Sequence, residues 1–550
     1  MPEAGAKEAH ASDSEPALNI GELLTAAAYS HPVGKIQVDE THISWVILTG
    51  EFAYKVKKRL KLEFLDTREL ATRRFLCEEE LRLNRRLAPD LYLEVVPIAQ
   101  DAQGLHVAGD GSVVDYAVKM RQFEPREELP ALLVRAGVAP DEMIALAKRL
   151  AEFHRRAATP EASFDYVSRL RECVLGNLTT LLAHLPPLKG TATIGEVIDW
   201  THDSLHDLHE QFQQRQAEGY IRECHGDLHA HNIVRWQGQL TPFDCLEFDP
   251  KLRFIDVMND VAFLVMDLIG HGHEDLAYVF LNSYVEQTGD YNGVRLLPFY
   301  GANRALVRAM VDALGMEQRP AEWLTWRGRM QGRIATALQF IRAAPPTLYI
   351  MYGPSGSGKS WLSEHLVPLV GAVRLRSDVE RKRLASQATT PTRDLARTAN
   401  LYNPAHNQQT YARLLKCAQS CLQGGIGVII DAAFLRVEDR QQFKALADRL
   451  GASFVIISCV ASREEMAQRI TRRAIDKADP SDATVAVLNQ QLESLVPLQA
   501  EELRSVIQVN TLQPNAEHAA LATLRAREAN TARETAWPLR RHQEIPPLHY

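Results

Sequence analysis

The sequence predicts two domains of different class: an α+β domain with two lobes, followed by an α/β domain with three layers and a mainly parallel sheet. Three observations support this prediction. A chain of 550 residues exceeds what one hydrophobic core usually supports. The first part has strand patterns and then long helical stretches, whereas residues 347–510 alternate apolar strands with helices. Between the two parts, Pro345 and Pro346 end the last helical stretch.

The first domain is expected at residues 17–342. An acidic leader rich in small residues precedes it at residues 1–16, and we expect this leader to be disordered. Within the domain, strand patterns fill a small lobe at about residues 17–123. Helical patterns fill a larger lobe at about residues 124–342, so the domain is expected to be bilobal.

The elements of the small lobe follow from periodicity. Residues 43–57 consist of a strand, a Thr-Gly-Glu turn and a second strand, which is the pattern of a β-hairpin. A helix is expected at residues 67–87, where apolar residues recur at helical spacing, and further strands at 91–99 and 112–123. The helical lobe is exemplified by residues 139–157, in which a Pro-Asp-Glu start precedes an apolar face.

A linker at residues 343–346 leads into the second domain at residues 347–510. Apolar runs there alternate with helical patterns, which is typical of a parallel sheet covered by helices. A polar tail with one expected helix follows at residues 511–550. The five expected strands are residues 347–353, 372–377, 425–431, 453–460 and 505–510.

Composition narrows the class of protein. Apolar residues make up 46% of the chain and charged residues 24%, which is ordinary for a globular protein, and the net charge of −7 gives no global attraction to nucleic acid or anionic lipid. No segment has the roughly 18 unbroken apolar residues of a membrane span, and the start lacks a secretory signal. The seven scattered cysteines indicate buried thiols in a reducing compartment. We therefore expect a cytoplasmic protein with no membrane partner.

The strongest motif is GPSGSGKS, which fits G-x-x-x-x-G-K-[ST] between an apolar strand and a helical run. Glycines in such a loop (a P-loop) let backbone N–H groups point at phosphate oxygens, and the helix N-terminus adds positive charge. Lys359 would reach the β- and γ-phosphates, and Ser360 would bind Mg²⁺. A simple Gly/Ser-rich turn is the alternative. The residues expected to bind ATP here are Gly353, Pro354, Ser355, Gly356, Ser357, Gly358, Lys359 and Ser360.

Two carboxylates downstream suggest the reaction. Asp431 ends an apolar strand in GVIIDAAF, where a Walker-B carboxylate would hold Mg²⁺. Asp378 and Arg381 lie one helical turn apart in RLRSDVERKRL. With the P-loop, this pattern resembles polynucleotide kinase, zeta toxin and related P-loop kinases among the AAA-type ATP-binding proteins. The resemblance implies a P-loop NTPase fold, with Asp378 orienting or deprotonating an accepting hydroxyl and Arg381 positioning acceptor or phosphate. Otherwise Asp378 caps a helix and Arg381 is solvated.

A third basic group belongs to the same domain. The run EEMAQRITRRA offers Arg469, Arg472 and Arg473, any of which could neutralise charge on the γ-phosphate as a lid arginine. An exposed helix face explains the same run, and the sequence does not choose among the three.

A different kinase motif stands in the first domain. CHGDLHAHN places Asp227 and Asn232 five residues apart, the spacing of the catalytic loop H-R-D-L-x-x-x-N. It resembles the aminoglycoside phosphotransferase and choline kinase branch of the protein-kinase-like fold. The resemblance implies that Asp227 accepts the proton of the substrate hydroxyl, that Asn232 and Asp244 bind Mg²⁺, with Glu247 as a further possible ligand, and that Asp260 braces the catalytic loop.

The small lobe agrees with this resemblance. FAYKVKK offers Lys55, or less favourably Lys57, as the strand lysine for the α- and β-phosphates, and Glu80 is its expected helix partner. Two features depart from the family pattern. The first hairpin has one glycine, Gly50, in place of G-x-G-x-x-G, and the metal-binding motif is FDCLE in place of DFG.

A metal cluster is the competing interpretation of the loop. His225, Asp227, His229 and His231 alternate, so on a strand they would share a face, and a hydrolase could use such a set. Asn232 and Asp244 would then have no role, which favours the kinase-like interpretation.

The sequence thus predicts a bifunctional phosphotransferase that uses ATP and Mg²⁺ in both domains and phosphorylates a hydroxyl of an unidentified small molecule, nucleoside or nucleotide. Two alternatives stay open. One is a nucleic-acid 5′-hydroxyl kinase or repair factor, which the acidic net charge disfavours. The other is an ATP-sensing regulator with little catalysis.

Overall fold

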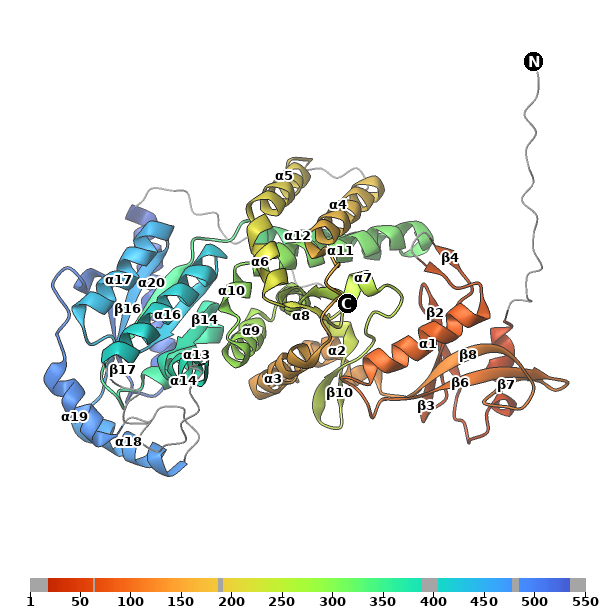
Figure 1. The fold of residues 1–550 in the computed structure, drawn as a ribbon, viewed down its shortest axis with the longest axis horizontal. Helices are drawn as coiled ribbons and strands as arrows, with labels where there is room; N and C mark the ends of the chain where they lie inside the picture. Colours follow the sequence, from red (N-terminus) through yellow and green to blue (C-terminus); the bar gives the residue numbers. More distant parts are fainter. Residues whose placement is uncertain (1–17, 63–64, 186–190, 388–403, 477–483, 535–550) are drawn as a thin grey trace, which may run out of the picture. The chain divides into compact units, whose positions relative to one another are not determined.

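The computed structural model describes residues 18–62, 65–185, 191–387, 404–476 and 484–534 (Figure 1). The leader expected at residues 1–16 lies outside them. In the part of the chain that is described, no helix is both long enough and apolar enough to span a membrane.

Contacts divide the chain into two compact units, and each is described by itself. Unit 1 comprises Met1–Glu142, Glu152–Leu170 and Gln211–Asp260, and unit 2 comprises Met143–Ala151, Arg171–Glu210 and Val261–Tyr550. The boundary between domains that the sequence places at residues 343–346 stays a prediction. Three helices begin in one unit and end in the other: α4 (Tyr166–His184), α6 (His209–Ala217) and α8 (Val257–Gly270). Helix α3 (Pro140–Arg156) begins and ends in unit 1, and its middle residues, Met143–Ala151, are assigned to unit 2.

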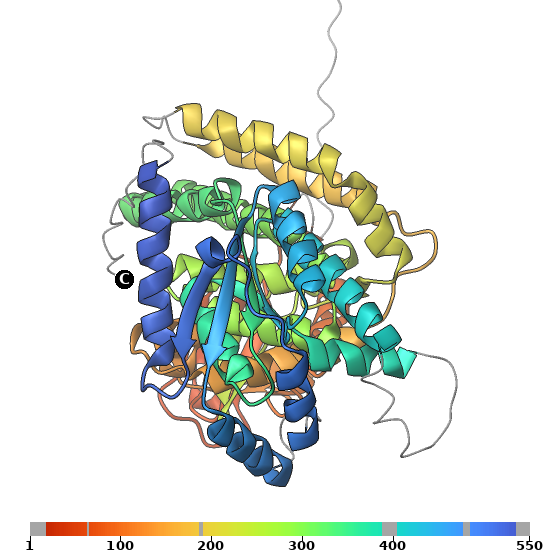
Figure 2. The ribbon, with the colours of Figure 1, turned by 90° about the vertical axis from the view of Figure 1, so that its left-hand side faces the viewer.

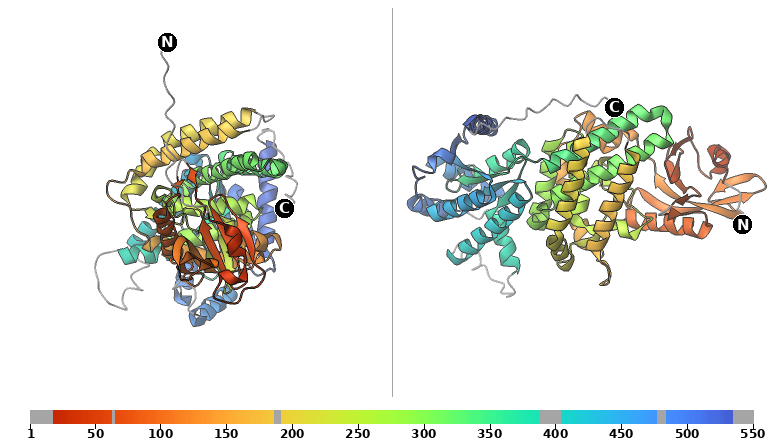
Figure 3. Two further views of the ribbon diagram at one scale, coloured as in Figure 1. Left: turned by 90° about the vertical axis from the view of Figure 1, so that its right-hand side faces the viewer. Right: turned by 90° about the horizontal axis from the view of Figure 1, so that it is seen from above.

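Unit 1 contains a six-stranded antiparallel sheet of order β1-β2-β3-β8-β6-β7, seen in red and orange in the left panel of Figure 3. The hairpin and the two later strands expected in the small lobe are confirmed as β2, β3, β6 and β8. The strands are β1 (Gln37–Glu40), β2 (Ser44–Leu48), β3 (Phe52–Lys57), β6 (Tyr92–Asp101), β7 (Gly104–Val107) and β8 (Ser112–Arg121).

The two faces of this sheet have different roles. Tyr54 and Val56 of β3 belong to one apolar cluster, with Ile47 and Ile98. Because side chains of a strand alternate between faces, Lys55 and Lys57 point to the opposite face. That face carries helix α1 (Leu70–Asn84), whose Cys77 packs with Ala53 and Val118. The strand therefore presents both lysines to α1 and to the site.

The rest of unit 1 consists of short elements that hold loops. Strands β9 and β12 pair, as do β10 and β11, and the segment between β9 and β10 contains Asp227 and Asn232. The elements are β4 (Lys61–Leu62), β5 (Leu65–Asp66), α2 (Leu129–Val134), β9 (Ile221–Glu223), β10 (Ile233–Trp236), β11 (Gln239–Pro242), α7 (Pro250–Arg253) and β12 (Phe254–Asp256).

The C-terminal part of unit 2 is a five-stranded sheet of order β14-β15-β13-β16-β17, in which every pairing is parallel. All five expected strands are found. They are β13 (Thr347–Tyr352), β14 (Ala372–Arg376), β15 (Gly427–Asp431), β16 (Ser453–Val460) and β17 (Val506–Asn510).

Helices cover both faces of this sheet, which confirms the predicted three layers (Figure 2). On one face α13 and α20 pack against Met351, Ile429 and Ile457, while α16 and α17 contact the strands from the other side. Helix α20 is the one helix expected in the polar tail, and its Ala520 and Leu524 join the core. The helices are α13 (Lys359–Val370), α14 (Ser377–Gln387), α16 (Pro404–Gln423), α17 (Val437–Leu450), α18 (Arg463–Asp476), α19 (Val485–Ser494) and α20 (Ala516–Glu534).

Unit 2 also contains the helices that precede β13. Its second apolar cluster joins α5, α8, α11 and α12 through residues such as Val197, Phe263 and Ala305. Helix α9 lies beside the edge strand β14, where the side-chain oxygen of Asn282 accepts a hydrogen bond from the backbone N–H of Arg374 at 2.8 Å. The helices are α5 (Thr191–Asp207), α9 (Glu274–Thr288), α10 (Tyr291–Val294), α11 (Leu297–Gln318) and α12 (Trp323–Ile341).

Candidate functional site

The first candidate site is built on two buried lysines of β3. Lys55 Nζ lies 2.8 Å from Glu80 Oε1 and also contacts Asp244 Oδ1. Lys57 Nζ lies between Glu80 Oε2 and Glu247 Oε1. Glu80 thus holds both lysines from α1. The predicted Lys55–Glu80 pair and the approach of Lys55 to Asp244 are both present in the structure, although their roles in binding stay predictions.

The positions of the two lysines separate their roles. The side chain of Lys57 is 1% exposed and is enclosed by two carboxylates, whereas Lys55 reaches Asp244, whose side chain is 38% exposed. Lys55 is therefore the lysine on the open side, which favours it over Lys57 as the phosphate contact. Glu247, considered as a further metal ligand, is nearly enclosed and lies against Lys57.

Charge pairing sets the protonation states of this cluster. Burial by itself would lower the pKa of Lys55, but the carboxylates of Asp244, Glu80 and Glu247 outweigh burial and hold that pKa well above its ordinary value. Burial would raise the pKa of Glu80, and the two lysines reverse the shift, so this pKa is lowered. Lys55 and Glu80 therefore remain charged at neutral pH.

The catalytic-loop residues contact each other. Asn232 Nδ2 donates to the carboxylate Oδ2 of Asp227 and to its backbone oxygen, both at 3.0 Å. His229 Nε2 lies 3.4 Å from the same carboxylate oxygen. The five-residue spacing in the sequence thus becomes a side-chain contact that holds Asp227, the expected proton acceptor, in one orientation.

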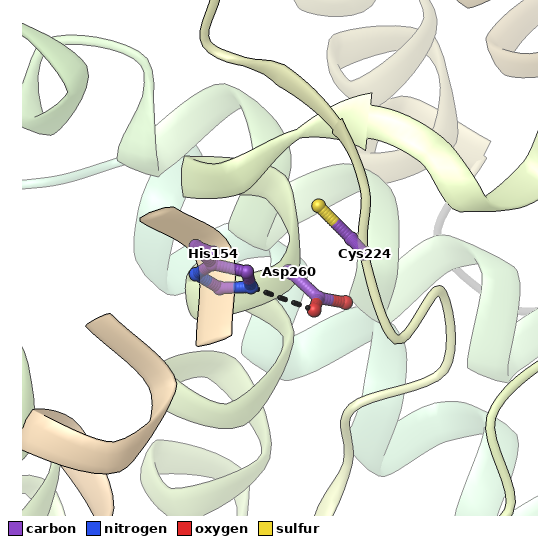
Figure 4. A group of neighbouring side chains, drawn as sticks. All are labelled: His154, Cys224 and Asp260. Carbon is purple, nitrogen blue, oxygen red and sulfur yellow. Dashed lines mark hydrogen bonds and ion pairs between the residues drawn. The ribbon is translucent and has the colours of Figure 1, made fainter. Parts of the chain in front are cut away.

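Asp260, which the family resemblance gives as the brace of this loop, lies beside His154 and Cys224 (Figure 4). Its carboxylate accepts hydrogen bonds from the backbone N–H groups of His225 and Gly226, each at 3.0 Å. His154 Nε2 lies 3.1 Å from the same carboxylate. Asp260 and His154 are both buried, and burial would raise the pKa of Asp260, but His154 and His225 outweigh it and the pKa is lowered.

Within the described residues, His154, Cys224 and Asp260 are the group whose donor atoms lie close enough to hold a metal ion. Asp260 already accepts three hydrogen bonds, and Cys224 Sγ lies 3.5 Å from the carbonyl oxygen of Ile255. This arrangement is that of a hydrogen-bonded brace. The ring of His225 also contacts backbone at both nitrogens, through the Phe243 carbonyl at 2.9 Å and the Asp227 N–H at 3.3 Å, which disfavours the histidine metal cluster.

Asp244 is held by residues that lie outside the sequence motifs. Its φ angle of 61° lies in the left-handed region, which is costly for a residue with a side chain. The backbone N–H of Asp244 donates to the hydroxyl of Tyr92 at 3.2 Å, and that of Cys245 donates to Asn84 Oδ1 at 2.9 Å. Asn84 lies one helical turn after Glu80 on α1, and this spacing could have suggested it.

The second candidate site is the P-loop between β13 and α13. Gly353, Gly356 and Gly358 have φ angles of 141°, 82° and 89°. A Cβ atom at Gly356 would lie 2.5 Å from the backbone oxygen of Met466, so the loop has no space for a side chain there. These glycines turn the backbone between strand and helix as a phosphate-binding loop requires.

Lys359, Ser360 and Asp431 meet at the end of this loop. Ser360 Oγ donates to Asp431 Oδ1 at 3.2 Å, and Lys359 Nζ donates to the Pro354 carbonyl at 2.8 Å. Lys359 is buried, and burial lowers its pKa. A hydroxyl beside a carboxylate is the oxygen donor set that suits Mg²⁺, and the buried lysine suits a phosphate, so these residues fit the predicted Mg²⁺ and triphosphate.

Asp378 and Arg381 lie together on α14. Arg381 NH1 is 2.5 Å from Asp378 Oδ1, and its NH2 is 3.5 Å from Asn407 Oδ1. Arg381 is buried, so the alternative of a solvated surface arginine does not describe it. The Asp378–Arg381 contact does not test the catalytic roles of the two residues, which stay predictions.

The three candidate lid arginines of α18 have different environments. Arg469 NH1 lies 3.0 Å from Thr511 Oγ1 and 3.5 Å from the Gly356 carbonyl, so Arg469 supports the loop from outside. Arg472 is exposed. Burial is the main cause of the lowered pKa of Lys359, and the charge of Arg473 adds a smaller lowering to it, so Arg473 stays a lid candidate.

Two arginines of β14 were missed by the sequence analysis. Arg374 NH1 donates to the backbone oxygen of Ser360 at 3.0 Å, and Arg376 Nε lies 3.8 Å from Asp431 Oδ2. Thr511, placed in the predicted tail, was also missed, and its hydroxyl donates to the Ser357 carbonyl at 2.9 Å. Alternation along β14 could have suggested that Arg374 and Arg376 share a face.

Comparison with known proteins adds a family model and relatives. Residues 348–498 match the model of a family described as an AAA domain. The uncharacterised proteins Rv2004c of Mycobacterium tuberculosis and Mb2027c of Mycobacterium bovis are each 31% identical to this chain over 465 residues, which is 84% of this chain and 91% of theirs.

Solved structures match parts of the chain. A putative kinase from Chloroflexus aurantiacus has 22% identity and a TM-score of 0.27, covering 34% of this chain and 99% of its own. A gluconokinase from Sinorhizobium meliloti has 19% identity and a TM-score of 0.25, with coverages of 34% and 98%. A choline/ethanolamine kinase family protein from Mesorhizobium loti has 12% identity and a TM-score of 0.36, with coverages of 57% and 90%.

Proposed function

We propose that this chain, which belongs to the same family as the mycobacterial proteins Rv2004c and Mb2027c, is an ATP-dependent phosphotransferase with two nucleotide sites. The observation that carries the proposal is the meeting of Lys359, Ser360 and Asp431 where a glycine-rich loop joins a parallel strand to a helix. The acceptor in our proposal is a hydroxyl of a small molecule, nucleoside or nucleotide.

In the P-loop site, backbone N–H groups of residues 353–360 would bind the phosphate oxygens, and Lys359 would exchange its carbonyl partner for the β- and γ-phosphates. Mg²⁺, when bound by Ser360 and Asp431, supplies positive charge that offsets the charge of the triphosphate. Asp378 would orient the acceptor hydroxyl and take its proton. Arg381 and Arg473 would position the transferred group and neutralise its charge.

In the first site, Lys55 would exchange Asp244 for the α- and β-phosphates while Glu80 keeps the lysine in place. Asn232 and Asp244 are the residues that would hold Mg²⁺. Asp227, oriented by Asn232 and by the loop that Asp260 braces, would accept the proton of the substrate hydroxyl.

The same transfer would occur in either site. A bond forms between the acceptor oxygen and the γ-phosphorus, and the bond from that phosphorus to the bridging oxygen of ADP breaks. The hydroxyl proton goes to the carboxylate, and ADP and a phosphate monoester leave. The protein contributes positioning and charge, because this transfer needs little covalent chemistry from it.

The surface of α14 does not favour a nucleic-acid substrate over a small one. Arg381 is paired with Asp378, and Arg383 with the buried Glu380, so two of the three basic residues 381–383 are held by carboxylates of the same helix. A small acceptor therefore remains our first choice, in a cytoplasmic setting.

The test measures transfer of label from γ-labelled ATP to a metabolite extract. Wild-type protein is compared with Asp227→Ala and Lys359→Ala, each expected to remove the transfer that depends on its own site by at least about a hundredfold. The matched controls are Asp203→Ala and Lys444→Ala, whose side chains are exposed and lie outside both sites. Tight ATP binding without any labelled acceptor would contradict a phosphotransferase and indicate an ATP-sensing regulator.

A further inference from the structure

Helix α9 precedes the segment that matches the AAA family model, yet within unit 2 it packs against the P-loop sheet (Figure 1). Tyr278 packs against the apolar cluster of β13, β15 and α13. A Cβ atom at Gly371, between α13 and β14, would lie 3.0 Å from the Tyr278 ring. With the hydrogen bond from Arg374 to Asn282, these contacts make α9 a covering element of the edge strand β14.

One acidic side chain of α9 meets both arginines of that strand. Glu286 Oε2 lies 3.6 Å from Arg374 NH2, and Glu286 Oε1 lies 3.6 Å from Arg376 NH1. Arg374 and Arg376 are two residues apart on β14 and so share a face. The side chain of Glu286 is 24% exposed, that of Arg374 5% and that of Arg376 14%, so water screens these charges only in part.

The same guanidinium groups also reach the P-loop site through other nitrogen atoms. Arg374 donates to the backbone oxygen of Ser360, and Arg376 lies 3.8 Å from Asp431 Oδ2. The second carboxylate oxygen of Asp431 accepts from Ser360. Arg376 is therefore shared between Glu286 on one side and Asp431, an expected Mg²⁺ ligand, on the other.

This sharing has an electrostatic consequence. A cation that binds Asp431 competes with the positive charge of Arg376 for the same carboxylate. Glu286 offsets part of that charge and holds the guanidinium on the α9 side. Without the Glu286 charge, Arg376 would pair more strongly with Asp431, because opposite charges at such distances in a partly buried site interact strongly.

We propose that Glu286 is a positioning residue of the P-loop site. It keeps Arg376 from pairing so strongly with the carboxylate of Asp431 that Mg²⁺ is excluded, and it thereby sets the Mg²⁺ concentration that nucleotide binding requires. This inference rests on the proposed function of the P-loop, and it extends the site beyond the segment that matches the AAA family model. It also predicts that a helix outside that segment controls the affinity of the P-loop for its metal.

The experiment measures binding of a fluorescent ATP analogue as Mg²⁺ is titrated. It uses the full chain with Asp244→Ala, which removes an expected metal ligand of the first site, as the parent protein. Glu286→Gln in this parent is expected to raise the Mg²⁺ concentration at half-saturation about fivefold, the size of a coupling near 1 kcal/mol. Asp275→Asn, an exposed carboxylate of the same helix, is the control and should leave the value unchanged.

A second substitution separates positioning from simple support of the fold. Adding Arg376→Gln to Glu286→Gln removes the competing charge and should return the Mg²⁺ requirement to within about twofold of the parent. If Glu286 only stabilised the packing of α9, the double variant would bind no better and would melt at a lower temperature than either single variant. That result would overturn the inference.

The outcomes also separate this inference from the proposed function. If the parent binds the analogue and Lys359→Ala abolishes binding, the P-loop function stands, and an unchanged Mg²⁺ requirement in Glu286→Gln overturns the role of Glu286 alone. If the parent shows no binding that depends on Lys359, the proposed P-loop function and the inference built on it are both wrong.

Discussion

The two candidate sites handle charge by different means. In unit 1, Lys55 and Lys57 are held by Glu80, Asp244 and Glu247, so charged side chains build the site. In unit 2, the P-loop is built from glycine backbone, and the ammonium of its one lysine is hydrogen-bonded to a backbone carbonyl. From this comparison we expect the lysines of the first site to stabilise the fold as well as to bind a ligand, and the lysine of the second site to affect mainly ligand binding.

The largest effect that tests this difference is expected at Lys57. Lys57→Met leaves Glu80 with a single lysine and Glu247 without its close partner, both of them buried. Breaking a buried ion pair by removing one member costs about 3–5 kcal/mol, and we expect a loss of at least about 3 kcal/mol in unit 1. Hydrogen exchange of the β3 amides measures it, because exchange reports local opening separately from unit 2.

The control is Lys119→Met on the neighbouring strand β8. Lys119 pairs with Glu94, whose side chain is 56% exposed, so the same substitution should cost no more than about 1 kcal/mol. Equal protection of β3 in the Lys57 and Lys119 variants would show that the buried pairs of unit 1 do not stabilise it.

Lys359→Met should change ligand binding much more than stability, which is the reverse of the effect expected for Lys57→Met. It replaces a buried ammonium by an apolar chain of similar length, so the free energy of unfolding of unit 2 should change by less than about 1 kcal/mol. Binding of an ATP analogue should weaken by at least about tenfold, since the contact to the phosphates is lost. Denaturant unfolding with and without the analogue measures both quantities. A strongly destabilised Lys359→Met with normal binding would reverse the comparison.

The smallest effect concerns pH. Burial lowers the pKa of Lys359, so this side chain loses its proton at a lower pH than an ordinary lysine, whose pKa is about 10.4. As pH rises through the alkaline range, nucleotide affinity at the P-loop should fall before that ordinary pKa is reached. Lys359→Arg, which stays charged, should show no such fall. Parallel pH profiles of analogue binding for the two proteins would contradict this role of the lowered pKa.

Much of the fold follows from local patterns. The β2–β3 hairpin, helix α1 and all five strands of the parallel sheet were predicted because apolar spacing and turn residues act within a few positions. The P-loop, and the contact of Asp227 with Asn232, follow from short motifs for the same reason.

Other parts of the sites depend on long-range packing. The preference for Lys55 over Lys57 needs the position of α1, which places Glu80 between them. The brace on Asp260 needs His154, which lies 106 residues earlier in the chain. Arg374 meets Asn282 across 92 positions. Such contacts leave no periodic signal in a single sequence, so His154 and Asn282 were missed, although Lys55 and Asp260 were themselves predicted.

The hydrogen bond from Arg374 to Asn282 has a practical consequence for anyone who trims this protein. A fragment starting at β13 would keep every residue that matches the AAA family model and lose α9. Its outermost strand would then present an unpaired N–H group, together with the apolar surface now covered by Tyr278. Bare edge strands recruit other chains, so such a fragment would be prone to self-association, and expression should begin upstream of α9.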